Sequence, residues 1–476
     1  MNRVLFALFC ALVVAVAAEN EAETKEVKFH TWALLVAGSK GYKNYRHQAD
    51  VCHMYQAIHN LGVPEEQIIV MMEDDLVYNT KNVYPGALYN TLDGPYGENV
   101  YQGVPHDYTH NLVTAENFQK ILLGQEMTVG SGKTLKTGPE DNIIVFYSDH
   151  GNTDMIAFPD ESEFTSADFK NTINWMAGNN TFKNLVFFIE ACYSGSLFYT
   201  LDLPPNVFVT TAAPVGISSY GYCGGFCDLY SLLLISDLES AHPKGYTLRD
   251  QFENIVDAMH ASQGCSYGGS DLSQMTLEEL FGPSFTSNGR SVHPLPPVVA
   301  SDLIPNEKFE LWAAKRDYEK NPSAENRREL NKQIAIQNHI DAMGISIVSA
   351  AMPHVPRLAT VPCTVCDDSC DCYYLCIDDF TADYCTFECC NEDSCLRPYG
   401  SSSSGHHMAG TRESVDEESC VLTLSRELRG QCRMKHPYLL SLELQFRRVC
   451  RQSDVNISSA VNEIRRQCAS FDAASF

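Results

Sequence analysis

The stretch "FFIEACYSGS" (Phe187–Ser196) decides the predicted fold of this chain. With the preceding "NLV" (184–186) it forms a continuous apolar run that ends in an acid, a cysteine and small residues. Such runs are typical of strands buried on both faces, as in a parallel sheet. Cys192 therefore lies where a buried strand gives way to a turn. It is either a thiol that only packs or a nucleophile.

Similar apolar runs recur along the first ~280 residues. The other predicted strands are residues 31–39, 67–72, 142–151 and 206–213. Between the first two strands, apolar residues recur at the spacing of a helix face: Val51, Met54, Tyr55, Ile58 and Leu61. Gly62 and Pro64 end this predicted helix. The pattern predicts an α/β domain whose mostly parallel sheet is flanked by helices on both faces.

The N-terminus is typical of a secretory signal peptide covering residues 1–18. Arg3 precedes an apolar stretch that closes in Val16-Ala17-Ala18, a small-residue cleavage pattern. No later run reaches the ~20 apolar residues of a membrane span. The net charge of −26 argues against nucleic acid as a partner, because a phosphate backbone needs a basic face. We expect a soluble protein that enters the secretory pathway.

The 19 cysteines are unevenly placed, and in an oxidising compartment they indicate disulfides. Nine fall between Cys363 and Cys395, and their lack of histidine favours a disulfide-knotted insert over a zinc site. Four more are widely spaced near the C-terminus: Cys420, Cys432, Cys450 and Cys468. Two sequons, at Asn179 and Asn456, predict glycosylation.

Composition changes along the chain predict its domain boundaries. The expected parts are the signal peptide (1–18), a catalytic domain (19–290), a linker and activation-peptide helix (291–360), a Cys-rich insert (361–396), a flexible linker (397–418) and a helical domain (419–476). Residues 396–476 contain eleven Lys/Arg and nine Asp/Glu, a net +2, so the remaining 395 residues carry −28. This split indicates either electrostatic docking of the C-terminal domain or ordinary surface scatter.

Two predicted strand ends carry reactive side chains, and active groups collect at such ends in open α/β sheets. One end carries Asp149-His150-Gly151 and the other Glu190-Ala191-Cys192. A thiol is mostly protonated at neutral or acid pH, so it needs a base, which a neighbouring histidine provides. The N–H groups of Gly151 and Cys192 are candidates for an oxyanion hole. Taken singly, an inert buried cysteine and a structural histidine remain open interpretations.

"VFYSDHG", followed about forty residues later by "EACYSGS", resembles the legumains, the asparaginyl endopeptidases of the caspase-like cysteine peptidases. The resemblance extends to residues 36–75, to "YQGVPHDYT" (101–109), to "TTAAPVGISSY" (210–220) and to the four-cysteine C-terminal segment. Only the Cys-rich insert and the adjoining linker lie outside it. The resemblance implies a caspase-like catalytic fold with a C-terminal helical prodomain.

By this resemblance Cys192 is the nucleophile and His150 the general base and acid. Asn44 matches the residue that orients the imidazole. Asp149 matches a position prone to succinimide formation, or it is a turn residue that caps the strand end. No cofactor and no metal site are expected.

The resemblance also places a specificity pocket for an Asn side chain, which offers both an acceptor and a donor. Arg46 supplies donors, and Glu190 and Asp228 supply acceptors. His47, Ser219 and Tyr220 match nearby positions. Without the resemblance, Arg46 and Asp228 are an ordinary ion pair. Two departures stand out: Tyr193 replaces the Glu of many relatives, and the short loop before Asp228 carries Cys223 and Cys227.

The resemblance implies that the helical tail inhibits the enzyme until acid releases it, with bridges Cys420–Cys450 and Cys432–Cys468. The expected attraction runs from acids of the catalytic domain to tail arginines, among them Arg426, Arg433 and Arg447. Cleavage is then expected within residues 315–345. Asn321 precedes Pro322 and makes a poor site, so Asn326 and Asn331 are the candidates.

These observations predict a lysosomal, vacuolar or secreted cysteine endopeptidase that cleaves after Asn, and after Asp in acid. Expected partners are protein and peptide substrates, the chain's own prodomain and cystatin-type inhibitors. Peptide ligation is an alternative, since an amine can replace water at the thioester. A GPI-anchor transamidase subunit shares the Cys–His core but normally carries a membrane span. A non-catalytic adhesion protein on this scaffold is the third alternative.

Overall fold

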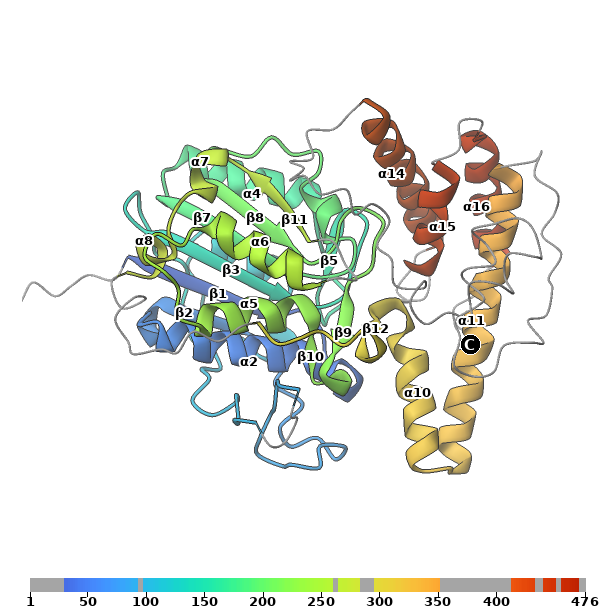
Figure 1. Cartoon of the computed structure of the whole chain (residues 1–476), viewed down its shortest axis with the longest axis horizontal. Helices are drawn as coiled ribbons and strands as arrows, with labels where there is room; N and C mark the ends of the chain where they lie inside the picture. The colour runs from blue at the N-terminus through green and yellow to red at the C-terminus, as the bar shows by residue number, and fades with distance from the viewer. Residues whose placement is uncertain are drawn as a thin grey trace, which may run out of the picture.

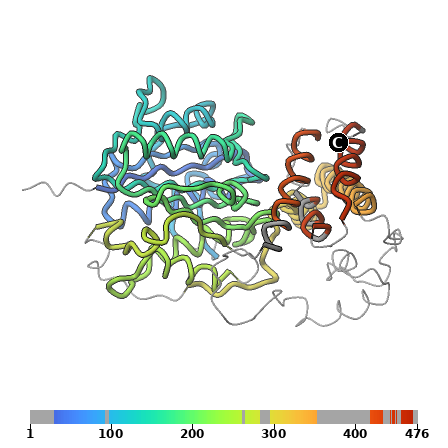
Figure 2. The backbone as a smooth tube through the Cα atoms, turned by 90° about the horizontal axis from the view of Figure 1, so that it is seen from above, coloured from blue at the N-terminus to red at the C-terminus, as the bar shows by residue number. Residues whose placement is uncertain are grey.

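The computed structural model describes residues 30–92, 97–259, 264–282, 295–351, 412–432, 440–450 and 455–470. The predicted signal peptide and the predicted Cys-rich insert lie outside the described residues. Figures 1 and 2 show an α/β body beside a separate group of long helices.

A six-stranded sheet forms the centre of the α/β body, in the order β11-β8-β7-β3-β1-β2. Its strands are β1 Thr31–Ala37, β2 Ile68–Met71, β3 Asn142–Ser148, β7 Asn184–Glu190, β8 Val207–Thr211 and β11 Cys265–Gly268. The first five pair in parallel, and β11 joins β8 antiparallel. The predicted mostly parallel sheet is therefore confirmed, and each predicted strand is present.

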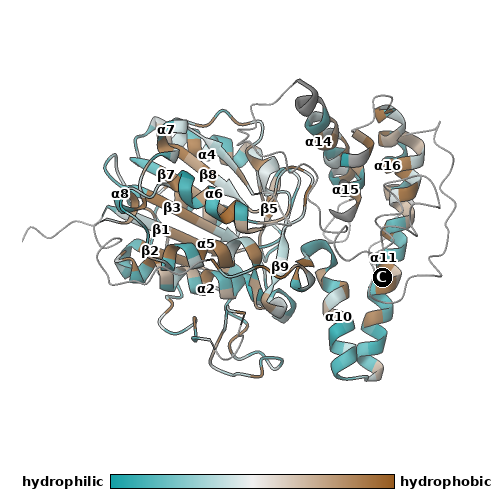
Figure 3. Cartoon of the chain, in the orientation of Figure 1, coloured by the Kyte–Doolittle hydropathy of each residue, from teal (hydrophilic) through white to brown (hydrophobic). Residues whose placement is uncertain are grey.

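Helices cover both faces of this sheet, as predicted (Figure 1). They are α2 Tyr45–Asn60, α3 Ala115–Leu122, α4 Ser166–Gly178, α5 Leu229–Glu239 and α6 Leu248–Met259. Side chains alternate across β1, so Ala33 and Leu35 join one core with α2, α5 and α6, whereas Leu34 and Val36 join another with α3 and α4. Figure 3 shows the strands as hydrophobic ribbons between helices of mixed hydropathy.

Helix α2 begins beyond the carboxyl end of β1 and positions several buried polar groups. Asn44 precedes its first residue, and the helix gives way at Leu61 to Gly62, which has φ 100°. Arg46, His47 and Asp50 are fully buried in its first two turns. Buried charges need partners, so this end of the helix indicates a polar site.

Two three-stranded sheets flank the carboxyl ends of the central strands. One consists of β4 Gly151–Asn152, β5 Met155–Ala157 and β6 Glu163–Thr165. The other consists of β9 Tyr220–Tyr222, β10 Cys227–Asp228 and β12 Ile304–Pro305, with β9 in the middle. The second sheet thus joins a strand from the predicted linker to the catalytic body.

The helical body contains α11 Ala324–Ala351, α14 Arg412–Cys432, α15 Leu440–Cys450 and α16 Ile457–Ser470 around one apolar core. Helix α10, Phe309–Lys320, pairs with α11. Bridges join Cys420 to Cys450 and Cys432 to Cys468, the pairing that the resemblance implies. Two details differ from expectation. Helix α14 begins inside the predicted linker, and α11 packs with the tail helices because both bury apolar faces against each other.

The tail contacts the catalytic body through α14 and α15. Arg426 forms an ion pair with Asp154, beside β4 and β5, and Val421 and Leu422 pack on Val215. The expectation for Arg447 was wrong in part. Its carboxylate partners are Glu417 and Glu418 of the tail itself, and it reaches the catalytic body only through the carbonyl oxygen of Val215. The side chain of Arg433 lies outside the described residues.

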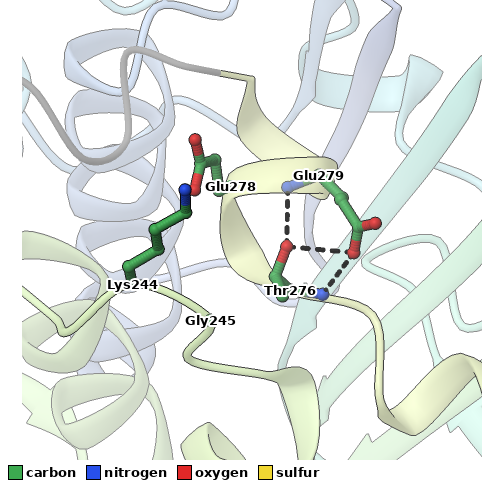
Figure 4. Close-up of a pocket in the computed structure, with 5 residues that line it drawn as sticks. All are labelled: Lys244, Gly245, Thr276, Glu278 and Glu279. Carbon is green, nitrogen blue, oxygen red and sulfur yellow. Dashed lines mark hydrogen bonds between the residues drawn. The ribbon is translucent and has the colours of Figure 1, made fainter.

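A surface pocket of about 340 Å³ opens at the amino-terminal end of the sheet (Figure 4). It is lined by Lys244, Gly245, Thr276, Glu278 and Glu279. Thr276 and Glu279 satisfy each other in a capping box that starts α8, Leu277–Phe281. The carbonyl oxygen of Leu280, in that helix, accepts from Thr31 at the start of β1. The pocket is thus remote from the strand ends that carry reactive groups.

Among the helices that the structure describes, none is long and apolar enough to cross a membrane.

Candidate active site

His150 and Cys192 follow neighbouring strands whose ends are in register. Ser148, the last residue of β3, lies opposite Glu190, the last of β7. The N–H of Asp149 then donates to the carbonyl oxygen of Glu190 at 3.1 Å. The predicted pair is therefore brought to one edge of the sheet because its two strands are adjacent and parallel.

At Gly151 the backbone that follows β3 lies close to the backbone of Ala191 and Cys192, which follow β7. A Cβ added there would lie 2.4 Å from the carbonyl oxygen of Cys192 and 2.9 Å from the Cβ of Ala191. The expectation was that glycine lets the backbone approach a substrate. The structure adds another reason, since any side chain at this position would push the backbone of the two reactive segments apart.

His150 is oriented by Asn44. The ring Nε2 lies 2.9 Å from the Oδ1 of Asn44, whose Nδ2 donates to the carbonyl oxygen of Lys40 at 3.0 Å. The second bond fixes the amide so that its oxygen faces the ring, which assigns the proton to Nε2. The Nδ1 then carries the lone pair that a general base needs.

Cys192 is buried, with 1% of its surface exposed, and its Sγ lies 3.7 Å from the Oγ of Ser219. Burial raises the pKa of this thiol to about 12, and the nearby charge of Glu307 adds to the shift. The thiol is therefore protonated at any physiological pH in this state. Catalysis requires a base and removal of the groups that cover it.

The backbone of Tyr193 turns left-handed directly after Cys192, with φ 57°, and its side chain is fully buried. Tyr193, the first of the two expected departures, is therefore a packing residue next to Cys192. The other departure is a closed loop, because Cys223 and Cys227 form a disulfide. That bridge holds the turn that leads from β9 to β10 and Asp228.

The predicted pocket residues meet beside Cys192. Arg46 donates through Nε to Asp228 at 2.9 Å, and both side chains are fully buried. The imidazole of His47 lies between two acids, 3.1 Å from Asp149 and 3.5 Å from Asp228. Arg46 and Asp228 thus form the ion pair that was expected without the resemblance. That ion pair lies inside the polar cluster beside Cys192.

Glu190 supplies a second buried carboxyl to this cluster. Its Oε2 accepts from the N–H of Ser231 at 3.2 Å. Burial raises its pKa well above the usual range, and the charge of Asp228 raises it further. Tyr220 begins the adjoining strand β9 and is partly exposed. The pocket therefore combines one guanidinium with several carboxyl groups that compete for it.

Asp50 belongs to the same cluster, although the sequence analysis missed it. Its carboxylate accepts from Ser148 at 3.0 Å, from Asn90 at 2.7 Å and from the N–H of Asp228 at 3.3 Å. It thereby ties the pocket strand β10 to the end of the catalytic strand β3. Its position one helical turn after Arg46 was the available signal.

Asn306 was also missed, because "HPLPPVV" and its surroundings indicated only a linker. Its side chain is 2% exposed, and its Nδ2 donates to the Oγ of Ser219 at 2.9 Å and to Asp228 at 3.1 Å. Its N–H donates to the carbonyl oxygen of Ser219 at 3.0 Å. A carboxamide of this chain thus occupies the predicted pocket.

Asp149 is almost fully buried, and burial raises its pKa to about 8. Its oxygens lie 3.1 Å from His47 and 3.3 Å from the hydroxyl of Tyr147. These contacts agree with a residue that caps the strand end, and the succinimide interpretation is left untested.

His47, Asp149 and His150 place three atoms able to ligate a metal within 4.8 Å of one another. Each of these groups is already engaged, however. Ser39 and Asp149 face the Nδ1 of His47, and Asn44 faces His150.

The two predicted glycosylation sites lie on exposed helix ends. Asn179 ends α4 and donates to the carbonyl oxygen of Trp175 at 2.8 Å. Asn456 precedes α16 and accepts from the N–H of Ser459 at 3.0 Å.

Comparison with known proteins relates this geometry to one family. Residues 31–284 match the family described as Peptidase C13. Legumain of Homo sapiens is 37% identical over 360 residues, covering 71% of this chain and 81% of the relative. The vacuolar-processing enzyme beta-isozyme of Arabidopsis thaliana is 42% identical over 256 residues, covering 50% of this chain and 51% of the relative. The crystal structure of caspase-1 from Spodoptera frugiperda aligns at a TM-score of 0.33 and 11% identity, over 51% of this chain and 87% of that chain.

Proposed function

The chain belongs to the peptidase C13 family of cysteine peptidases, and from this premise we propose that it cleaves peptide bonds after asparagine and folds as a latent precursor that acid activates. The observation that carries the proposal is the carboxamide of Asn306 in the pocket beside Cys192. Ser219 and Asp228 accept from its Nδ2, and Arg46, which donates to Asp228, is in the same cluster as a donor for the side-chain oxygen of a substrate Asn.

The chemistry begins with transfer of the Cys192 proton to His150. The thiolate attacks the carbonyl carbon of the substrate Asn, and the N–H groups of Gly151 and Cys192 stabilise the oxyanion. His150 then gives its proton to the leaving amine, and water hydrolyses the thioester. Asn44 keeps the imidazole oriented throughout. An amine that replaced water would give ligation, the alternative activity of the same intermediate.

Latency is supported by what covers the site. The Asn306 segment fills the pocket, and the ring of Phe309 lies 4.0 Å from the guanidinium carbon of Arg46. Helices α14, α15 and α16 are linked by two disulfides and share an apolar core with α11. This helical body contacts the catalytic domain through Arg426 and Val421. We therefore assign the inhibition to the segment that holds Asn306 together with the helical prodomain expected at residues 419–476. A lysosomal or vacuolar location, and inhibition by cystatin-type proteins, are parts of the same proposal by analogy with legumains.

The pocket charge makes the choice between Asn and Asp depend on pH. An ionised Asp side chain is repelled by the pocket acids, whereas a protonated Asp imitates Asn. An Asp side chain titrates near pH 4, so its protonated fraction falls roughly fiftyfold or more between about pH 4.5 and 6.5. Relative to matched Asn peptides, hydrolysis of Asp peptides by the acid-activated enzyme should fall by a similar factor. An Asp/Asn ratio that stays constant over this range would contradict the assignment of the pocket.

The ion pair between Asp154 and Arg426 offers a test of whether the helical tail keeps the precursor inactive. Asp154 has φ 62°, a conformation that Asn tolerates, so Asp154→Asn removes the charge and keeps the shape. Because Arg426 is half exposed, the pair contributes only about 0.5 kcal/mol, or roughly a twofold shift toward the open form.

The expected result for Asp154→Asn is a precursor with about twofold higher activity at neutral pH and a higher pH for tail release. Glu163→Gln is the matched control, since Glu163 lies 3.9 Å from Arg429 and contributes less. If the two variants had equal activity at neutral pH, inhibition by the tail would depend on other contacts.

A further inference from the structure

The segment Ile304–Asn306 lies against the catalytic body as an added edge strand. Ile304 pairs antiparallel with Gly221 and Pro305 with Tyr220, and the N–H of Asn306 donates to the carbonyl oxygen of Ser219. Addition of an extended peptide to a sheet edge is a general mode of peptide recognition, in which main-chain bonds give affinity and pockets give side-chain specificity. Figure 1 shows β12 beside β9 at the boundary between the two bodies.

The side chain of Asn306 then enters the pocket that the proposed function assigns to a substrate Asn. Its donor end is engaged by Asp228 and Ser219. Its acceptor end is not, because Asn306 Oδ1 and the Nη1 and Nη2 of Arg46 are buried atoms without a hydrogen-bond partner in the described part of the chain. The bound amide is therefore one interaction short of full recognition.

The residue after Asn306 is buried, and its charge reaches Cys192. Glu307 is 3% exposed, and its carboxylate is close enough to Cys192 to contribute to the raised pKa of the thiol. The same charge acts on Tyr220, which pairs with Pro305. Geometry supports the same placement, because the Oγ of Ser219, which accepts from Asn306 at 2.9 Å, lies 3.7 Å from the Sγ of Cys192. We infer that the peptide bond between Asn306 and Glu307 lies between the specificity pocket and the thiol.

We propose that residues 304–307 are bound as the enzyme's own substrate and that Asn306–Glu307 is a bond that Cys192 cleaves when acid activates the precursor. This inference rests on the proposed function. The Sγ of Cys192 bonds to the carbonyl carbon of Asn306, the C–N bond to Glu307 breaks, and His150 delivers the thiol proton to the released amine. Water then hydrolyses the thioester, which leaves a carboxylate on Asn306 and restores the thiol.

The cut would separate the catalytic domain from everything that follows residue 306. The sites predicted from sequence are less suitable in this state, because Asn326 and Asn331 lie within helix α11 and a helical backbone cannot add to a sheet edge. The Nδ2 of Asn326 is also held by the carbonyl oxygens of Asp317 and Asn321.

Charge explains why the bond survives at neutral pH. An ionised Glu307 beside Cys192 opposes formation of the thiolate, and the amide lacks its contact with Arg46. Cleavage therefore requires that two obstacles be removed, and the first is the charge of Glu307 near the thiol. A small movement of Asn306 toward the guanidinium removes the second.

The test uses the full-length precursor, incubated at about pH 4.5, with intact-mass measurement and N-terminal sequencing over time. The expected early product begins at Glu307, and it should be absent from Cys192→Ala. Asn306→Ala should slow its appearance by roughly a hundredfold, because a pocket built for an amide rejects a side chain without one. Asn326→Ala and Asn331→Ala are matched controls that leave this product unchanged.

A second measurement does not depend on the folding of a variant. A synthetic peptide with the sequence of residues 301–310 is offered to the activated enzyme, beside an Ala-Ala-Asn fluorogenic peptide. We expect the enzyme to cleave both peptides, and to cleave the peptide of residues 301–310 after Asn306. Turnover of the fluorogenic peptide without a product starting at Glu307 from the precursor would overturn the inference and leave the proposed function standing. No turnover of either peptide, with the tail removed, would overturn the proposed function itself.

Discussion

Replacement of Cys192 by alanine is expected to lower kcat/KM for an Asn peptide by about 10⁴-fold or more, since the thiol forms the covalent intermediate. His150→Ala should cause a comparable loss, and the double variant should be no worse, because the two groups act as a unit. The measurement is the initial rate with an Ala-Ala-Asn fluorogenic peptide after acid activation. The neighbouring structure should be unaffected, because the change removes a single buried sulfur.

Cys265→Ala provides the matched control. Cys265 is another cysteine, on strand β11, and burial raises its pKa to about 11. It lies outside the polar cluster, so its replacement should change the rate by less than about twofold. If Cys192→Ala kept more than about a hundredth of the activity, the assignment of the nucleophile would be wrong.

Replacement of Arg46 is the second change with a large expected effect. It should lower both the stability of the fold and the hydrolysis of Asn peptides. Arg46 is a fully buried cation that pairs with Asp228, and its charge also acts on Glu190. Arg46→Met keeps much of the apolar volume but leaves these carboxyl groups without their guanidinium. Removing one partner of a buried pair typically costs about 3–5 kcal/mol. Hydrolysis of Asn peptides should be lost as well, because the donor for the side-chain oxygen is gone.

The destabilisation should depend on pH in a defined direction. Burial raises the pKa of Asp50 and of Glu190 well above their usual range, so the folded state binds these protons more tightly than the unfolded state. Stability from this source is greatest below the unfolded pKa, near 4, and falls as pH rises toward the folded pKa. Since Arg46 lowers the pKa of Glu190, its loss should raise that pKa and carry the fall in stability to higher pH. Denaturant unfolding at about pH 4.5 and 7 measures the difference.

Arg316→Met is the control for the Arg46 variant. Arg316 also lies over an aromatic ring, 4.5 Å from Trp312, but its side chain is one-third exposed and donates to a backbone oxygen of the Gly224 turn. Its loss should cost less than about 1 kcal/mol. Equal losses in the two variants, or an Arg46 effect that is the same at both pH values, would contradict a cluster of buried carboxyl groups held by Arg46.

The catalytic strands and the reactive pair were predictable from sequence. Apolar runs indicate buried strands because the signal lies within a few consecutive residues. The polar residues of the site directly follow these runs in the sequence. His150 and Cys192 come together because β3 and β7 are parallel neighbours in register. Asn44 required the resemblance, since nothing local connects it to a histidine 106 positions away.

The tail was predicted less completely. Its two disulfides follow the pairing that the resemblance implies, yet the arginines divide in a way that charge counts do not show. Arg426 crosses to Asp154, whereas the carboxylate partners of Arg447 are in its own helical body. Net charge sums over a segment, and it does not say which side chains face the interface.

The sequence by itself determined the sheet, its covering helices and the chemistry at the strand ends, because periodicity and turn residues act over short stretches of chain. Only the tertiary structure decided which distant groups complete the site. Asn306 reaches Ser219 across 87 positions, and Asp50 reaches Asp228 across 178. Asp50 had looked like one more residue of a helix, and Asn306 like part of a linker. Each acquires a role because packing of the whole chain buries its polar group, and a buried polar group is stable only where the fold supplies a partner.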